Sequence, residues 1–255
     1  MPGRYHAPFA EQGTHRIDAD IADRLLKLAL SKGGDYADLF FEYSASGSYV
    51  YDEQILKSAR RAVSMGLGVR VMKGDATGYA YCEDFSFEAM KQAAETAARI
   101  AAGGKPVAPQ AVSVLETPNR YPVREESFDV DGEAKKAILE RAYRAARAAD
   151  GRVIRVDASF AESVREILVA NSLGHMARDR QPLIRFGVRV IAESDGNRQS
   201  GSSGGGGRTG LEYFDETTPE WHAEQAAQQA LVMLDAREAP AGEMDVVLGL
   251  SLIHI

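Results

Sequence analysis

The tetrapeptide Gly-Val-Arg-Val occurs at Gly68–Val71 and again in the second half of the chain at Gly187–Val190. Both copies lie in runs whose apolar residues alternate with polar ones, which is typical of a half-buried β-strand. In each half, one helical pattern precedes the strands and another follows them. We therefore predict an α+β fold of two related units, each combining an antiparallel sheet with helices. A chance recurrence of a short β-type tetrapeptide is the alternative.

The first unit is predicted over residues 20–104. Apolar residues at helical spacing indicate a helix at Asp20–Lys32, and Ser86 is a suitable N-cap for a second helix. Gly47-Ser48 is a plausible turn, and Lys73-Gly74-Asp75 is a hairpin signal. The strands of this unit are expected at Leu39–Tyr43, Tyr49–Tyr51, Gly66–Met72 and Gly78–Cys82.

The second unit is predicted over residues 126–240 and contains a glycine-rich segment, 196–210. A helical pattern covers Glu133–Ala149, with its apolar stripe at Ala134, Ile138, Ala142, Ala145 and Ala149. Thr218 and Pro219 are good N-cap and first-turn residues for a helix that runs through Leu234. The strands are expected at Val153–Ala161, Val164–Asn171 and Leu183–Ala192, with a turn after Asn171.

The predicted units are flanked by less regular sequence. Residues 1–19 are predicted to be a tail, and 105–125, which hold four of the nine prolines, are predicted to be a linker. The chain stops on the apolar run Val246–Ile255, and because chain ends are usually polar, this ending looks unfinished; the family resemblance given below implies that residues 241–255 begin a further domain.

Composition narrows the class of protein. The chain has 255 residues, and its net charge of −7 argues against a partner made of nucleic acid, which a basic face would bind. The one cysteine, Cys82, fits a reducing compartment. The N-terminus has no apolar signal region, and no apolar run is long enough to cross a membrane. We expect a soluble, cytoplasmic protein.

The glycine-rich segment is the most unusual stretch of the sequence. It satisfies a dinucleotide fingerprint at Gly205, Gly207 and Gly210, but no helix pattern opens at these glycines, so nucleotide binding is disfavoured. Composition alone favours a flexible surface loop. The second interpretation is a backbone-rich edge that another chain can approach closely. Arg198 and Arg208 are then candidate donors to a carboxylate or carbonyl.

No complete catalytic constellation is found in the sequence. Cys82 lies in a predicted strand away from any histidine, which favours a buried, inert thiol. The five histidines, His222 among them, show no metal-ligand spacing and are interpreted as structural or solvated. Paired acidic residues such as Glu125 and Glu126 are interpreted as solvated faces.

Two stretches resemble a known family. Residues 190–208, which begin Val-Ile-Ala-Glu-Ser-Asp-Gly-Asn-Arg-Gln-Ser-Gly, and residues 239–249, Ala-Pro-Ala-Gly-Glu-Met-Asp-Val-Val-Leu-Gly, resemble the signatures of the PmbA/TldD family, formerly called modulators of DNA gyrase. Weaker matches lie at residues 35–40 and 66–71. The resemblance covers roughly residues 20–249 and is closer to the TldD branch than to the TldE (PmbA) branch.

The resemblance implies a zinc metalloprotease that pairs with a TldE/PmbA-like subunit as a heterodimer. It also implies that the substrates are unfolded peptides or leader peptides. The part of the protein seen here is expected to build the substrate chamber and the partner interface. A protease that accepts many sequences is expected to bind backbone by adding the substrate as a strand to an exposed edge. The candidate substrate-binding residues are Asn197, Arg198, Gly201, Gly204, Gly205, Gly206, Gly207 and Arg208.

The resemblance breaks at Leu250. The family's zinc motif, His-Glu-x-x-x-His, is absent: no glutamate follows His254, and we assign no catalytic or metal-binding residue. We interpret Ser251–Ile255 as translated adapter DNA and the chain as truncated before its catalytic domain. This chain is therefore predicted to be inactive and to bind no zinc. A stand-alone peptide-binding or scaffold module is the alternative function, and a DNA- or gyrase-binding regulator is a second one.

Overall fold

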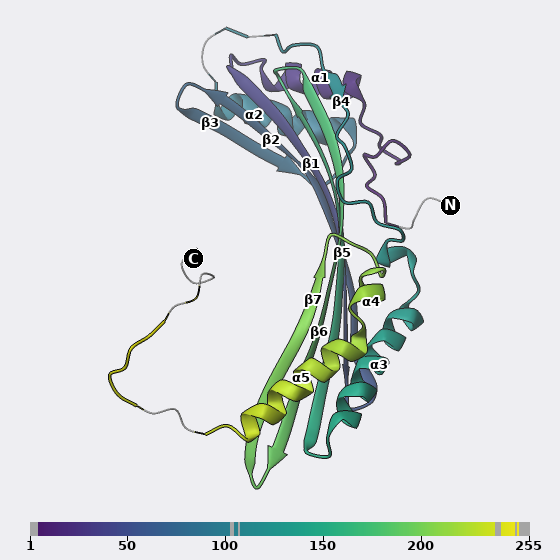
Figure 1. The fold of residues 1–255 in the computed structure, drawn as a ribbon. Coiled ribbons are helices and arrows are strands. Elements are labelled where there is room, and N and C mark those ends of the chain that lie inside the picture. Colours follow the sequence, from purple (N-terminus) through teal and green to yellow (C-terminus); the bar gives the residue numbers. More distant parts are fainter. Residues whose placement is uncertain (1–4, 103–104, 107, 238–240, 248, 250–255) are drawn as a thin grey trace.

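Both copies of the tetrapeptide lie in long strands of one seven-stranded sheet (Figure 1). The computed structural model describes residues 5–102, 105–106, 108–237, 241–247 and 249. The strands are β1 (Tyr36–Asp52), β2 (Ile55–Lys73), β3 (Ala76–Cys82), β4 (Ser113–Leu115), β5 (Val153–Asn171), β6 (His175–Ser194) and β7 (Asn197–Gly207). The helices are α1 (Ala19–Ala29), α2 (Phe87–Ile100), α3 (Gly132–Ala149), α4 (Tyr213–Glu216) and α5 (Pro219–Leu234), with a 3-10 turn, η1, at Ser127–Asp129.

The sheet has the strand order β3-β2-β1-β5-β6-β7, with the short β4 pairing in parallel with the first residues of β6. All other pairs are antiparallel. The order α1-β1-β2-β3-α2 in the first half is repeated as α3-β5-β6-β7-α5 in the second. The prediction of an α+β fold with two antiparallel, helix-bearing units is thus confirmed, and the two units share one continuous sheet through the β1–β5 pair.

The packing of two glycines shows that the halves correspond. Val71, the last residue of the first tetrapeptide, pairs with Gly78, and Val190, its counterpart, pairs with Gly201. A Cβ atom on either glycine would lie 2.1 Å from a helix carbonyl oxygen, that of Ala97 in α2 or that of Ala226 in α5. Each tetrapeptide therefore neighbours a glycine on which a helix rests.

All four long helices cover the same face of the sheet, as one pair over each half (Figure 1). One apolar core lies under α1 and α2 and contains Leu39, Phe41 and Val69. The other lies under α3 and α5 and contains Phe160 and Phe186. Side chains alternate along each strand, so the opposite face of the sheet carries the remaining residues, and no helix among the described residues covers it.

Two local predictions on the first strand differ from the structure. Gly47-Ser48 is not a turn, because β1 continues to Asp52 and the chain reverses at Glu53 and Gln54, both with positive φ (49° and 62°). Gly47 is needed for a different reason: a Cβ atom there would lie 2.8 Å from the buried carboxylate of Glu162.

The segment predicted as a tail is packed over the residues that the structure describes. Ala7, Phe9 and Ile17 are buried, and the Phe9 ring lies 5.6 Å from Phe41 and 5.4 Å from Phe85 between ring centroids. Apolar residues at irregular spacing gave no periodic signal, so sequence reasoning missed this arm. Met1–Arg4 lie outside the described residues.

Other predicted element boundaries differ from the observed ones by a few residues, and some predicted elements are joined in the structure. The two strands expected between Val153 and Asn171 are one strand, and the buried stripe of α3 runs through Lys135, Ile138, Leu139, Ala142 and Ala146, not through Ala134 and Ala149. The predicted linker contains β4. The terminal residues 250–255, interpreted above as foreign, lie outside the described residues. No helix in the described part of the chain has the length and apolar character to span a membrane.

Candidate functional site

The glycine-rich segment forms strand β7 at the edge of the sheet. A two-residue turn at Asp195 and Gly196, both with positive φ, reverses the chain from β6 into β7, as is typical of hairpins. In the described part of the chain β7 pairs with β6 alone, so its other side is an edge. The loop interpretation was therefore wrong, and the interpretation as an edge agrees with the structure.

Most of the glycines in β7 are explained by packing within the chain. A Cβ atom on Gly201, Gly204 or Gly206 would lie 2.1–2.5 Å from a backbone carbonyl oxygen of α5 or β6. A Cβ atom on Gly205 would lie 1.9 Å from the hydroxyl of Tyr213. A Cβ atom on Gly207, by contrast, would have no atom within 4 Å apart from its chain neighbours. Replacing all of these glycines would therefore disturb the fold before it tested a substrate contact.

Both arginines of the candidate site already have partners. Arg198 forms an ion pair with Glu193 of β6. Arg208 lies 2.7 Å from the Asp179 carboxylate and donates to the carbonyl oxygen of Arg180 at 2.7 Å. Burial alone would raise the pKa of Asp179, but hydrogen bonds from Arg208 and Gln181 outweigh it and hold that pKa below its ordinary value. Arg198 and Arg208 thus help to fix the ends of β7. From the sequence we expected both to be available to a ligand, but the structure pairs them within the chain.

His222 of α5 links β7 to α4 and α5 through hydrogen bonds. Its Nδ1 lies 2.8 Å from the hydroxyl of Ser203 in β7, and its Nε2 lies 2.9 Å from the hydroxyl of Tyr213. The imidazole is 2% exposed, and burial lowers its pKa, which favours the neutral form that accepts one hydrogen bond and donates the other. This arrangement agrees with the structural interpretation of His222. Burial also raises the pKa of the Cys82 thiol, which argues against a nucleophilic thiolate.

The open face of the sheet is hollowed beside β7. One hollow of about 830 Å³ crosses β2, β1, β5, β6 and β7, and a second of about 510 Å³ adjoins it along β5 and β6. Both hollows are lined by Ser48, Ala161 and Arg185, so they form one trough, which we call the central trough. Its floor consists of small side chains because Ser46, Ser48, Ala161, Ser163 and Gly187 point to this face.

Three arginines border the central trough. Arg60 of β2, Ser48, Ala161 and Arg185 of β6 lie in one row across the sheet, and Arg189 follows further along β6. All three arginines are exposed. Among the residues that the structure describes, none of the three forms an ion pair. The net charge of −7 therefore conceals a local positive surface that the sequence analysis did not predict.

Beneath the trough, on the helix side of the sheet, lies a buried ion pair. The Lys135 ammonium of α3 lies 2.7–2.8 Å from both carboxylate oxygens of Glu162 in β5, and both side chains are fully buried. Lys135 also lies 5.5 Å from the centroid of the Tyr49 ring, and Arg61 lies 3.8 Å from Glu162. Two cations thus offset the burial of one carboxylate, and the Tyr49 ring adds a cation–π contact to Lys135.

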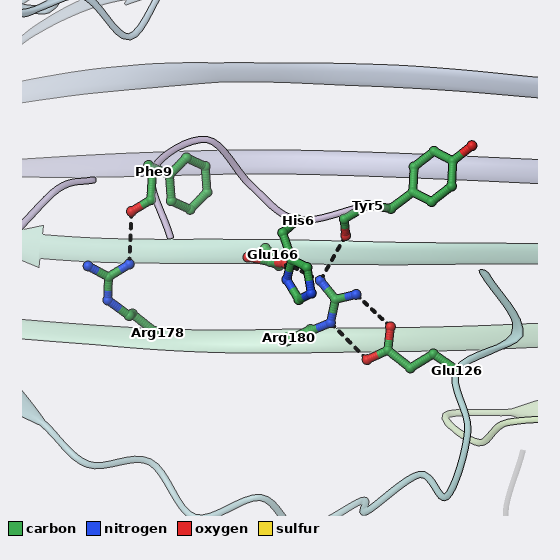
Figure 2. A network of polar contacts seen from close by, with 7 residues as sticks. All are labelled: Tyr5, His6, Phe9, Glu126, Glu166, Arg178 and Arg180. Carbon is green, nitrogen blue, oxygen red and sulfur yellow. Dashed lines mark hydrogen bonds and ion pairs between the residues drawn. The ribbon is translucent and has the colours of Figure 1, made fainter. Parts of the chain in front are cut away.

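A second polar network joins the N-terminal arm to the sheet (Figure 2). The Arg180 guanidinium of β6 pairs with Glu166 and Glu126 and donates to the carbonyl oxygen of Tyr5 at 3.1 Å. Burial alone would lower the pKa of Arg180, but the two carboxylates outweigh it and raise that pKa. His6 Nδ1 lies 3.0 Å from the same Glu166, so the arm is held against β5 and β6.

No metal centre is found in this part of the protein. Among the described residues, no three side chains of histidine, cysteine, aspartate or glutamate come together in a way that would hold a metal ion. The residues present therefore do not fit a metal cofactor, and we derive no chemical step through one.

Sequence reasoning gave the edge at 197–207 only as the second interpretation, and it missed both charged networks and the trough. Lys135 lies three residues before Ile138, on the apolar stripe of α3, and a charged residue in that position is a signal of burial. Glu162 and Glu166 likewise occupy inward positions of β5. The trough had no such signal, because it depends on which strands are neighbours.

Comparison with known proteins gives matches along most of the chain. Residues 37–101 match the family model described as PmbA/TldA metallopeptidase domain 1, and residues 125–234 match that of the PmbA/TldA metallopeptidase central domain. Two relatives are described as metalloprotease TldD homologs. The one from Haemophilus influenzae is 37% identical over 222 residues, and the one from Buchnera aphidicola subsp. Acyrthosiphon pisum is 32% identical over 229 residues. Each match covers 84% of this chain and 46% of the relative, so the chain spans about half the length of these proteins.

Solved structures share the fold. TldE from Thermococcus kodakarensis has a TM-score of 0.61 and 16% identity, covering 83% of this chain and 47% of that one. A Thermotoga maritima protein described in connection with DNA gyrase has a TM-score of 0.67 and 20% identity, covering 88% of this chain and 50% of that one.

Proposed function

Because the chain belongs to the PmbA/TldD metallopeptidase family, we propose that it forms the substrate-binding part of a TldD-type peptidase subunit that degrades unfolded peptides or trims leader peptides. The observation that carries this proposal is the sheet itself. One face is covered by helices, while the other face and the β7 edge are open to an extended chain.

The β7 edge is the proposed place of peptide addition. An edge strand offers unpaired backbone groups at regular intervals, which bind an extended peptide whatever its side chains are. The edge is rigid here, because α5 supports β7 through Gly201 and through the hydrogen bond from the Ser202 amide to Gln229 at 2.8 Å. This hydrogen bond occupies the Ser202 amide, so the peptide is expected to pair with the other outward-facing backbone groups of β7. A rigid edge reduces the entropy that is lost when a peptide binds.

Hydrogen exchange tests the edge without any substitution. An unfolded, uncharged peptide added to the full chain is expected to slow amide exchange in 197–207, because new interstrand hydrogen bonds protect the edge amides. The outer side of β2 over residues 55–66, which pairs with β1 alone, is the internal comparison. Protection at 55–66 instead of 197–207 would contradict the assignment to β7, and protection at neither edge would contradict strand addition.

The partner that we propose is a TldE/PmbA-like subunit in a heterodimer. Large apolar side chains gather on the open face of the first half: Tyr81 is 70% exposed, Tyr79 57% and Phe40 37%. Contiguous exposed aromatic surface is typical of protein interfaces, where aromatic residues are enriched. The fold shared with TldE is consistent with a pair of similar subunits.

Zinc content and turnover test the enzyme class. We expect the complete protein, purified with a TldE-like partner, to contain one zinc ion and to cleave an unfolded peptide. A chelator is expected to abolish the cleavage, and added zinc to restore it. The 255-residue chain alone is the control and is expected to bind no zinc stoichiometrically. Turnover that survives complete removal of metal would refute the metallopeptidase assignment.

A further inference from the structure

Among the arginines on the open face, two groups differ in their surroundings. Arg70 is paired with Asp38, Arg155 with Asp52 and Asp157, and Arg165 with Glu42. The arginines that border the central trough, Arg60, Arg185 and Arg189, have no carboxylate partner among the described residues.

The internal repeat allows a paired arginine and an unpaired arginine to be compared at equivalent positions. Arg70 and Arg189 are the arginines of the two tetrapeptides, and each faces an aspartate across the neighbouring strand, Asp38 or Asp157. Arg70 binds its aspartate, whereas the Asp157 carboxylate is taken by Arg155, whose Nη2 lies 3.0 Å away. Arg189 in the second half therefore has no carboxylate partner among the described residues, whereas Arg70, its counterpart in the first half, has one.

The spacing of Arg60 and Arg185 matches an extended chain that crosses the strands, and Arg189 lies at a right angle to that line. Arg60 and Arg185 are separated by two intervening strands, so their backbones lie about 14 Å apart, and Arg185 and Arg189 are about 13 Å apart along β6. Residues i and i+4 of an extended peptide are also about 13 Å apart. The floor between the arginines is made of Ser48 and Ala161, which are small enough for a peptide to lie close to the sheet.

We propose that the central trough binds acidic segments of peptide substrates, with Arg60 and Arg185 receiving carboxylates about four residues apart and Arg189 adding positive charge beside them. This inference rests on the proposed function and adds a substrate preference to it. An exposed guanidinium without a partner forms bidentate contacts with a carboxylate, which supplies both affinity and orientation. A single-stranded nucleic acid fits less well, because the floor side chains offer no aromatic ring on which bases would stack.

Two labelled peptides test the proposal. Both are unstructured and twelve residues long, and one has glutamate at positions 4 and 8 where the other has glutamine. Fluorescence anisotropy with the full chain at low salt is expected to show about 10-fold tighter binding of the glutamate peptide, as expected for two exposed ion pairs. Higher salt is expected to reduce this preference.

Matched variants locate the preference. Arg185→Gln is expected to reduce it to about 3-fold, and Arg60→Gln combined with Arg185→Gln to remove it. Arg70→Gln changes the net charge equally on the same face but removes a paired arginine, so the preference is expected to stay within about 2-fold of the original. Binding of the glutamine peptide is expected to be the same in all variants.

Each contrary result has a distinct meaning. Equal loss in Arg70→Gln and Arg185→Gln would refute the trough, because the effect would then come from net charge. Equal affinity for the two peptides would refute the acidic preference while leaving the proposed function intact, and failure to bind either peptide would contradict the proposed function itself. A single-stranded DNA twelve-mer that binds tighter than the glutamate peptide, and depends on Arg185, would replace the peptide proposal with nucleic-acid binding.

Discussion

Lys135→Met is expected to lower the free energy of unfolding by about 3–5 kcal/mol, because it leaves the Glu162 carboxylate buried without its nearest cation. Both side chains are fully buried, so water cannot replace the lost partner. A loss of this size is comparable with the whole stability of many domains, and part of the chain is therefore expected to be unfolded at 25 °C. Urea denaturation followed by circular dichroism measures the effect.

The neighbouring residue provides a matched control. Lys136 lies on the same helix but is 36% exposed and faces Glu133 and Glu140 at the surface. Lys136→Met is expected to change stability by less than about 0.5 kcal/mol. The double variant Lys135→Met with Glu162→Leu removes both charges and is expected to recover most of the loss. Equal destabilisation by Lys135→Met and Lys136→Met would show that the buried pair is not important for stability.

Gly201→Ala is expected to cost about 1–3 kcal/mol, because the added methyl group forces α5 away from β7. The new Cβ atom would lie 2.1 Å from the carbonyl oxygen of Ala226 and 2.6 Å from the amide nitrogen of Ala230. Both are helix backbone atoms, which cannot move aside as a flexible side chain does. Trp221, the one tryptophan of the chain, lies on α5, so its fluorescence reports this displacement directly.

Two further glycines make this prediction specific. Gly78→Ala in the first half meets the carbonyl oxygen of Ala97 at the same 2.1 Å, and a similar destabilisation is expected. Gly207→Ala has open space around it, and a change within about 0.5 kcal/mol is expected. A destabilisation by Gly207→Ala as large as that by Gly201→Ala would mean that glycine flexibility, and not packing against the helix, is what β7 requires.

The parts of the fold that depend on local chemistry could be predicted from the sequence. Ser86 and Thr218 cap α2 and α5 with their side chains, as expected, and the turns at Lys73–Asp75 and after Asn171 lie between paired strands. The repeated tetrapeptide also indicated the relation between the halves. These signals are contained within a few residues, so no knowledge of the tertiary structure is needed to interpret them.

The features that sequence reasoning missed depend on distant contacts. Glu53 and Gln54 form a tight turn with positive φ although neither is a residue that favours it, because the long pairing of β1 with β2 imposes the reversal. Lys135 is buried only because Glu162, 27 residues away, faces it. The central trough exists because β1 lies beside β5, and no local pattern indicates that pairing.

The pairing of β1 with β5 also has a consequence for how this chain is organised as an assembly. Ala45 pairs with Val164, and the glycine-bearing units on either side are related by a half-turn about this pair. A single protein that folds in this way is equivalent to a symmetric dimer whose subunits have been joined by a linker. In a symmetric dimer, equivalent positions of the two subunits hold the same residue. Here the equivalent positions in the two halves hold Tyr43 and Glu162. The two halves therefore differ at this place: Tyr43 belongs to an apolar core, whereas Glu162 carries the buried charge.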